Sequence, residues 1–298
     1  MARDRGPGGG QAHRWGMAAP EVTVPSRGGH RPPERSLRVL LGDEHGLRFV
    51  RLKNYGLHLL HRLGLRRFRT RSVDLPGGMK ILVREDSHDA LIVREVWEED
   101  MYPLGDLGLT EGDAVIDCGA QIGSFSLLAA GRGARVLAFE PCPLNLERLR
   151  ENVALNGLEE RVEVTGAAVF RPGVASTELH LTYTNLAGHS LLGWIGPAVR
   201  VPCLSLAEIF ERHGLERCRL LKLDVEGAEC PILYTAGSEL LAKVERVYAE
   251  VIDHPAIEAF RQPGEAPHDH AGLMEFLAGE GFEVGYDATT KVVTGRRA

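Results

Sequence analysis

The chain has few cysteines, no long apolar run and no excess of positive charge, and each shortage disfavours a class of protein. Its 298 residues contain five scattered cysteines without C-x-x-C or Cys/His spacing, which is typical of reduced thiols in a cytoplasm rather than of a disulfide framework. No stretch of roughly 18 apolar residues occurs, so we expect no membrane span, and the first residues lack the apolar core of a signal peptide. The net charge of −6 gives no electrostatic case for a nucleic-acid partner. We therefore expect a cytoplasmic protein with one substantial core.

The chain also lacks the G-x-G-x-x-G turn of dinucleotide-binding proteins. In its place, residues 114–123 read Ala-Val-Ile-Asp-Cys-Gly-Ala-Gln-Ile-Gly: a strand ending in Asp117, then Gly119 and Gly123 before an apolar helix. A carboxylate at this turn would repel a pyrophosphate but would attract a ligand with adenosine at one end and a cation at the other. S-adenosylmethionine is such a ligand, so an NAD-dependent oxidoreductase is disfavoured. The alternative is that Asp117 only hydrogen-bonds the backbone of a tight turn.

A second predicted strand, residues 135–140, follows that helix and ends in Glu140. Two parallel strands joined by a helix place ligands at their carboxyl ends. There Glu140 could accept both ribose hydroxyls of an adenosine. A solvent-exposed glutamate before the next helix is the alternative.

Strands and helices alternate along the rest of the chain, which predicts an α/β fold with a doubly wound, mostly parallel sheet. Further strands are predicted at 161–169, 178–182, 198–204, 219–224 and 245–252, and helices at 122–131, 143–156, 205–213, from 228 and at 271–280. The terminal runs 281–287 and 290–294 could add an antiparallel edge.

The N-terminal part has a different character. Residues 1–36 are rich in Arg, Gly and Pro and predict a disordered tail. Residues 37–65 favour one or two short helices, residues 71–84 a hairpin, and Ser87 a helix cap before a helix that ends near Tyr102. We therefore predict a tail (1–36), an extension of helices and hairpin that covers the cofactor site (37–109), and the main domain (110–298).

A second group of charges lies in residues 220–229, Leu-Leu-Lys-Leu-Asp-Val-Glu-Gly-Ala-Glu. Lys222 and Asp224 share one face of the predicted strand, because side chains alternate along a strand. Buried charges are costly unless they pair or take part in chemistry. Favourable interaction with the next helix N-terminus could account for Glu229 entirely, but it explains neither Lys222 nor Asp224.

These segments together resemble the FkbM family of S-adenosylmethionine-dependent methyltransferases. The resemblance runs from about Val73 to the C-terminus and rests on residues 117–126, 139–141, 152–156 and, above all, 221–229. It implies the class I methyltransferase fold, with a Rossmann-like seven-stranded sheet, and O-methylation of hydroxyls on sugars, lipids or natural products. It also implies site residues: Asp117, Gly119 and Gly123 on the methionine side of S-adenosylmethionine, Glu140 on its ribose, and Asp224 and Glu226 beside the transferred methyl group.

Methyl transfer to a hydroxyl needs a base or a metal to remove the proton. The candidate bases are Asp224, Glu226, Glu250, His189 and His254, and Lys222 is expected to hold Asp224 ionised. A divalent metal on Asp224 and another carboxylate stays open, although no His/Asp spacing indicates one. The expected partner is a small-molecule hydroxyl acceptor. The alternative is a non-catalytic module that binds S-adenosylmethionine or a nucleotide, against which the intact charges at 222, 224 and 226 argue.

Overall fold

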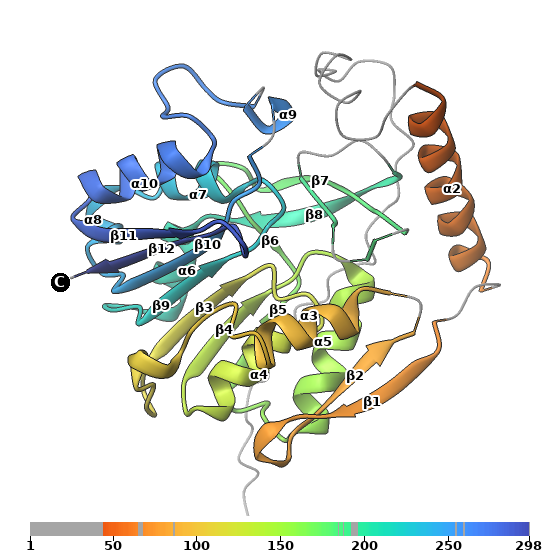
Figure 1. The fold of residues 1–298 in the computed structure, drawn as a ribbon, viewed down its shortest axis with the longest axis horizontal. Helices are drawn as coiled ribbons and strands as arrows, with labels where there is room; N and C mark the ends of the chain where they lie inside the picture. Colours follow the sequence, from red (N-terminus) through yellow and green to blue (C-terminus); the bar gives the residue numbers. More distant parts are fainter. Residues whose placement is uncertain are drawn as a thin grey trace, which may run out of the picture.

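The computed structural model describes residues 44–64, 68–85, 87–183, 185, 186, 188–191, 196–253, 255–258 and 260–297. The predicted tail at residues 1–36 and the candidate base His254 lie outside this range. Within it, a central sheet carries helices on both faces, and an N-terminal hairpin and helix lie at its side (Figure 1). None of the described helices has the length and apolar character needed to cross a membrane.

The central sheet has seven strands in the order β11-β12-β10-β9-β3-β4-β5. They are β3 (Ala114–Cys118), β4 (Arg135–Phe139), β5 (Val162–Thr165), β9 (Leu220–Leu223), β10 (Arg246–Glu250), β11 (Phe282–Asp287) and β12 (Val292–Arg297). The five strands from β10 to β5 pair in parallel, while β12 is antiparallel to β10 and to β11. The predicted parallel sheet and its antiparallel edge are both confirmed.

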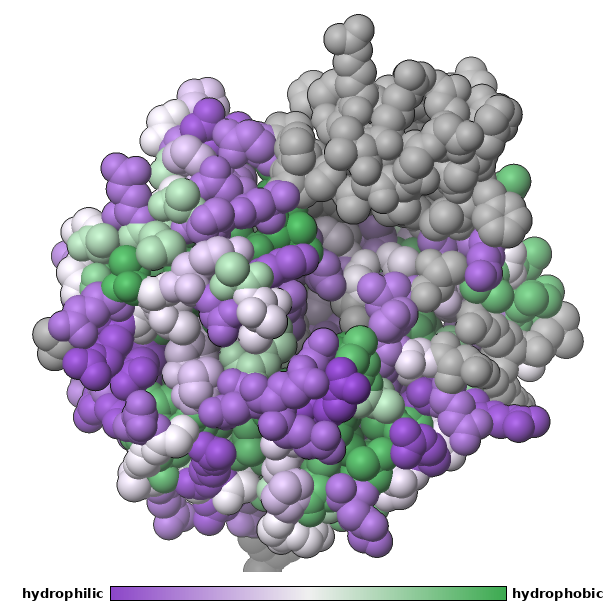
Figure 2. Space-filling view, in the orientation of Figure 1, coloured by the Kyte–Doolittle hydropathy of each residue, from purple (hydrophilic) through white to green (hydrophobic). Residues whose placement is uncertain are grey.

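Helices cover the sheet on two sides because alternate strand residues point to opposite faces. Ile116 and Cys118 of β3 belong to the core under α6 (Leu206–His213), α7 (Glu229–Tyr234), α8 (Ser238–Leu241) and α10 (His270–Gly279). Val115 belongs to the core under α3 (Asp89–Trp97), α4 (Ser124–Gly131) and α5 (Pro143–Leu155). The short α9 (Pro255–Glu258) lies in the loop after β10. Hydrophilic residues cover much of the described surface in Figure 2, as expected for a chain whose apolar residues fill these two layers.

One predicted strand, 161–169, is wrong as a single element. It is divided into β5 and β6 (Ala168–Val169), which pairs with β8 (Ala198–Leu204) in a separate three-stranded sheet completed by β7 (Ser176–His180). The break falls at Gly166, where a Cβ would lie 2.6 Å from Leu146 of α5. Glycine at this position leaves room for the Leu146 side chain at the point where the chain passes from one sheet to the other.

The N-terminal extension is built from α2 (Glu44–Arg62), the hairpin β1 (Thr70–Asp74) and β2 (Lys80–Arg84), and short 3₁₀ turns at Pro76–Gly78 and Gly105–Leu107. The described part of the predicted helical segment is thus one helix of 19 residues, and the hairpin is confirmed. The next helix, α3, has His88 at its N-cap position, without a side-chain capping hydrogen bond, and ends at Trp97, before Tyr102. Ser87 instead donates to the Arg84 carbonyl and accepts the Asp89 N–H, which closes the turn in front of the helix.

The turn after β3 depends on Gly119. Its φ is +77°, and a Cβ at this position would lie 1.8 Å from the carbonyl oxygen of Asp224. The backbones that follow β3 and β9 therefore lie in close contact here. A side chain larger than hydrogen at position 119 would force them apart.

We expect Gly119→Ala to destabilise the protein by about 3 kcal/mol or more, from backbone strain and overpacking together. Gly279→Ala is the matched control, because Gly279 has ordinary backbone angles and open space around it, so its stability should stay equal or rise by up to about 1 kcal/mol. Urea unfolding of both variants measures the difference. Equal midpoints for Gly119→Ala and the parent chain would contradict the close approach.

Candidate active site

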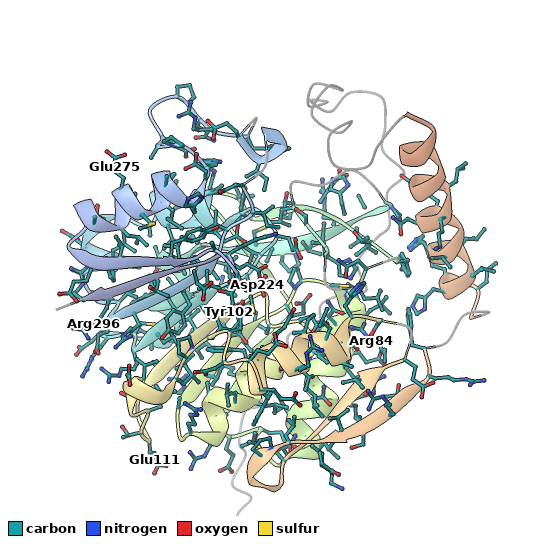
Figure 3. The ribbon with its side chains drawn as sticks, viewed as in Figure 1. Arg84, Tyr102, Glu111, Asp224, Glu275 and Arg296 are labelled. Carbon is teal, nitrogen blue, oxygen red and sulfur yellow. The ribbon has the colours of Figure 1, made fainter. Side chains whose placement is uncertain are left out.

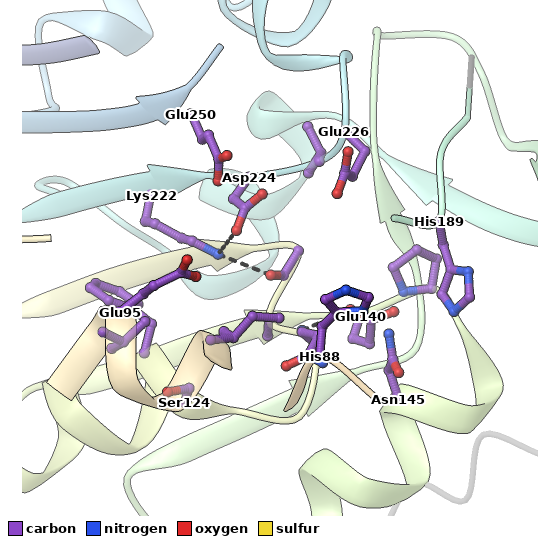
Figure 4. A pocket seen from close by; sticks show the side chains of 18 of the residues that line it. His88, Glu95, Ser124, Glu140, Asn145, His189, Lys222, Asp224, Glu226 and Glu250 are labelled. Carbon is purple, nitrogen blue, oxygen red and sulfur yellow. Dashed lines mark hydrogen bonds and ion pairs between the residues drawn. The ribbon is translucent and has the colours of Figure 1, made fainter. Parts of the chain in front are cut away.

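The carboxyl ends of β3, β4, β9 and β10 border a cavity of about 230 Å³. Tyr102 and Asp224 meet at this edge of the sheet (Figure 3). Figure 4 shows Asp224, Glu226 and Glu250 on one side of the cavity, with Glu140 lying apart from them. Sheets of this topology bind their ligands at the same edge, outside the strand ends. The cavity is therefore the candidate active site.

Lys222 is buried at this edge and interacts with two carboxylates. Its Nζ lies 3.1 Å from Oδ1 of Asp117 and 3.4 Å from Oδ2 of Asp224, and it donates to the Gly119 carbonyl at 2.9 Å. Asp117 and Lys222 are direct partners in the parallel register of β3 and β9, which brings their side chains to one face. The charged residues that the sequence places here thus form ion pairs, with one lysine between two carboxylates.

The environment of Lys222 keeps it charged. Burial alone would lower its pKa, but the charges of Asp117 and Asp224 outweigh burial and raise the pKa above its usual value. The rings of Tyr102 and Phe125 add a favourable cation–π contact, with centroids 5.5 and 5.9 Å from Nζ. Lys222 is therefore a cation inside the protein, paired with Asp117 and Asp224 and lying beside the rings of Phe125 of α4 and Tyr102.

Asp117 acts on the cavity only through Lys222. Its side chain is fully buried and does not line the cavity, and Ser126 donates to its Oδ2 at 2.6 Å. The contact between Asp117 and a ligand cation stays a prediction, and in this structure the partner of the Asp117 carboxylate is Lys222. The position of Asp117 makes it the residue that orients the lysine.

The two glycines of the turn have different positions. Gly119 lines the cavity, whereas Gly123 does not. Gly123 precedes α4 with a φ of +94°, and a Cβ there would lie 2.6 Å from Leu149 of α5. Gly119 thus shapes the cavity, and Gly123 lets α4 and α5 pack against each other behind it.

Glu140 ends β4 and lines the cavity while remaining almost fully buried. Its two carboxyl oxygens accept the backbone N–H groups of Gln121 and Cys142, each at 2.8 Å. Burial raises its pKa to about 7, although these two hydrogen bonds act in the opposite direction. Each oxygen keeps a further lone pair, so Glu140 can still accept hydrogen bonds from a ligand.

A buried ion pair connects the N-terminal extension to this turn. Nε and Nη2 of Arg84 donate to Asp89 at 2.8 Å each, and Arg84 also donates to Asn145. Asp89 in turn accepts from the side chain of Gln121 at 2.9 Å. The hairpin and α3 therefore hold Gln121, and through its backbone N–H they also hold Glu140.

Glu226 and Glu250 complete the carboxylate cluster, which we define as Asp224, Glu226 and Glu250. Burial and the neighbouring charge of Asp224 raise the pKa of Glu226 to about 8 and that of Glu250 to about 9. Glu229, by contrast, does not line the cavity: it accepts the N–H groups of Val225 and Gly227 and shapes the turn. These contacts agree with the structural role that the sequence suggested for Glu229.

His189 lines the cavity as a neutral hydrogen-bond donor. Its Nδ1 accepts the Thr182 N–H at 2.9 Å, which leaves the proton on Nε2. Burial lowers its pKa to about 3, and Nε2 has no partner among the described residues. His189 is therefore poorly suited to the role of base considered from the sequence, and it is arranged to donate to a ligand.

Two cavity residues, Tyr102 and Glu95, were not identified from the sequence. The hydroxyl of Tyr102 donates to Oδ2 of Asp224 at 3.3 Å, and Glu95 lines the cavity from α3. The sequence did contain a signal for Glu95, because this carboxylate lies between the apolar residues Ile92 and Val96 of the predicted helix. Tyr102 had no local signal, since its partner lies 122 positions away.

The described part of the chain contains neither a cluster of metal-ligating side chains nor a disulfide. No group of three or more His, Cys, Asp or Glu there is arranged to hold a metal ion. All five cysteines are buried and unpaired, and burial raises the pKa of Cys142 to about 12. The thiols therefore act as small core side chains.

Comparison with known families gives a match over the region that contains the cavity. Residues 117–286 match the model of the methyltransferase FkbM domain. The range begins at Asp117 and includes the turn, Glu140, the 220–229 segment and Glu250. More than half of the chain is therefore covered by one family model.

Two curated relatives have related sequences. The chain is 27% identical to the AMB antimetabolite synthetase AmbE of Pseudomonas aeruginosa, over 71% of this chain but only 11% of that protein. It is 26% identical to the 31-O-demethyl-FK506 methyltransferase FkbM of Streptomyces tacrolimicus, over 60% of this chain and 80% of that protein. The chain thus spans a small part of the first relative and most of the second.

Among solved structures, the methyltransferase FkbM of Methylobacillus flagellatus is similar at 15% identity and a TM-score of 0.42. The match covers 65% of this chain and 46% of that one. Because this TM-score is low, the fold assignment rests on the order and direction of the strands described above and not on this likeness.

The raised pKa values of Glu226 and Glu250 make the protein less stable at high pH. The folded state keeps protons on Glu226 and Glu250 that the unfolded chain releases above its ordinary pKa of about 4.5. Stability from these groups is therefore present at low pH and is lost as pH rises toward about 9.

Glu250→Gln should raise the free energy of unfolding at pH 8 by on the order of 2 kcal/mol and leave it nearly unchanged at pH 4.5. Thermal unfolding across this pH range measures the effect. Glu275→Gln, on the outer face of α10 (Figure 3), is the control for loss of an exposed carboxylate. If the free energy of unfolding of Glu250→Gln depended on pH in the same way as that of the parent chain, the raised pKa of Glu250 would be contradicted.

Proposed function

Since this chain belongs to the FkbM family of methyltransferases, we propose that it transfers a methyl group from S-adenosylmethionine to a hydroxyl of a small molecule. The observation that carries this proposal is the arrangement of the cavity. One end presents Glu140 beside apolar residues, and the other presents the carboxylate cluster. A ligand with a ribose at one end and a positive charge at the other is complementary to both.

The residues present fit S-adenosylmethionine. Glu140 retains acceptor capacity for ribose hydroxyls, and Pro141, Ala168 and Leu179 supply apolar surface for a purine. The unpartnered Nε2 of His189 is a donor that the protein itself leaves unused. When bound, S-adenosylmethionine supplies an activated methyl group.

Asp224 is the member of the carboxylate cluster best placed to remove the proton of an acceptor hydroxyl. It is the residue of the cluster that pairs with Lys222, and its side chain is 31% exposed. Glu226 and Glu250, with pKa values of about 8 and 9, hold protons at neutral pH until a positive charge enters the cavity. Tyr102 and Lys222 fix the Asp224 carboxylate from two directions, which orients it for proton transfer.

A hydroxyl acceptor is supported by the chemistry of the site and by one relative. A base is needed for an alcohol, because an alcohol keeps its proton at neutral pH. The relative in Streptomyces tacrolimicus is named as a methyltransferase for 31-O-demethyl-FK506, a compound whose name specifies an oxygen without its methyl group. These two points favour oxygen as the methylated atom.

The proposal is tested by incubating the protein with isotope-labelled S-adenosylmethionine and a panel of hydroxylated metabolites. Mass spectrometry should detect S-adenosylhomocysteine together with a labelled methyl ether. Calorimetry with S-adenosylmethionine and NAD serves as the binding control, and only the first should bind. Binding without turnover on any acceptor would favour the non-catalytic module instead.

Asp224→Asn should lower turnover by roughly 10²–10⁴-fold, the range for a positioned acid–base group. The amide keeps the shape of the side chain, so cooperative unfolding should persist. Single-turnover rates with saturating cofactor measure the loss, with Glu275→Gln as the control. If Asp224→Asn were as fast as the parent enzyme, the base would have to be Glu226 or Glu250.

Glu140→Gln should weaken binding of S-adenosylmethionine by about 10-fold or more, because hydrogen bonds to a charged group contribute about 1.5–3 kcal/mol each. Gln keeps the size of the side chain but offers one acceptor oxygen for two backbone N–H groups, so thermal unfolding of the variant is measured alongside to check that the turn persists. Calorimetric titration gives the affinity of both proteins. An unchanged dissociation constant would place the ribose elsewhere in the cavity.

A further inference from the structure

The helix α2 exposes a row of leucines to solvent. Leu52, Leu59 and Leu60 are 73%, 57% and 42% exposed, and Leu63, just beyond the helix, is 61% exposed. Their spacing of seven, eight and eleven residues places all four on one side of the helix. They make up four of the six large apolar side chains that are exposed within the described ranges, so this surface differs from the rest of the protein.

The opposite side of α2 fixes it to the domain. Asn54 is fully buried and accepts the Tyr183 N–H at 2.8 Å. The ring of His58 hydrogen-bonds the Tyr183 hydroxyl at 2.9 Å, and Leu57 packs on the core beneath β7 and β8. The helix is thus held by one face, and the leucine row is not needed for that attachment.

The stretch of sequence from residue 45 to residue 73, which begins in α2 and continues past it, carries a charge opposite to that of the whole protein. Residues 45–73 contain eight Arg and Lys and no Asp or Glu. Since the net charge of the chain is −6, the other residues together carry −14. Lys53 and Arg62 are exposed on either side of the leucine row. Apolar residues flanked by basic ones form the pattern of a helix that lies in a membrane interface.

We propose that α2 docks the protein on an anionic lipid surface, with the leucine row inserted at the headgroup boundary and the basic residues against the headgroups. An acidic protein is repelled by such a surface unless one segment is strongly basic, and residues 45–73 are that segment. Nucleic acid would match the charge but would leave the leucines unused. The docking does not depend on the methyl transfer proposed above.

The test is co-sedimentation of the full chain with vesicles of phosphatidylcholine, with and without about one-third phosphatidylglycerol. We expect binding to the anionic vesicles that is at least about 10-fold stronger than to the neutral ones and that weakens with salt. Leu52→Ser/Leu59→Ser should reduce binding by about 10-fold or more through lost apolar burial. Lys53→Glu/Arg62→Glu should also reduce binding by about 10-fold or more, because it replaces two positive charges near the headgroups with negative ones.

Leu155→Ser is the matched control, because Leu155 is a 45% exposed leucine on α5, outside the basic segment. It should bind vesicles like the parent chain, and all variants should keep the parent melting temperature. Three results would overturn the proposal. They are absence of binding to anionic vesicles, equal loss in Leu155→Ser, and leucine-dependent self-association or duplex DNA binding in place of vesicle binding. Cofactor binding, measured separately, distinguishes these failures from failure of the proposed function.

Discussion

The buried ion pair between Lys222 and Asp117 is the interaction on which the site depends. It joins β3 and β9 at their carboxyl ends, where Gly119 lets the two backbones meet. Such pairs add little net stability, because desolvation offsets much of their attraction, but removing one partner leaves a costly buried charge. The pair therefore serves to fix geometry: with Lys222 held in place, Asp224 is held at the cavity wall.

One cation cannot balance all the carboxyl groups around the cavity. After Lys222 has paired with Asp117 and Asp224, Glu226 and Glu250 remain close together and hold protons at neutral pH. A positive charge in the cavity, such as that of the proposed cofactor, would offset the free energy that this arrangement costs. Local destabilisation of this kind is common at functional sites, where the surrounding fold is stable enough to bear it.

Local sequence patterns predicted the strands, the hairpin and the antiparallel edge, because β-branched runs, turn residues and caps act over a few positions. The pairing of Lys222 with Asp224 followed from the two-residue repeat of a strand. The division of 161–169 did not, because it depends on the distant strands with which each half pairs, β4 for the first half and β8 for the second. Nor did the role of His189, whose protonated nitrogen is set by the backbone of Thr182. Features of this kind can be recognised only when the distances between residues far apart in the sequence are known.

The N-terminal extension forms part of the site as well as its boundary. Arg84 and Asp89 hold Gln121, which holds Glu140, while α3 and the segment after it supply Glu95 and Tyr102 to the cavity wall. The helix α2 is attached at Tyr183, two residues before Asn185 of the loop that lines the same cavity. In the proposed function, Glu140 of the central sheet would contact the cofactor, whereas the surroundings of the acceptor would come partly from segments outside the sheet. Because those segments are tied to the sheet by a few polar contacts, their sequence can change acceptor choice without altering the ion pair beneath.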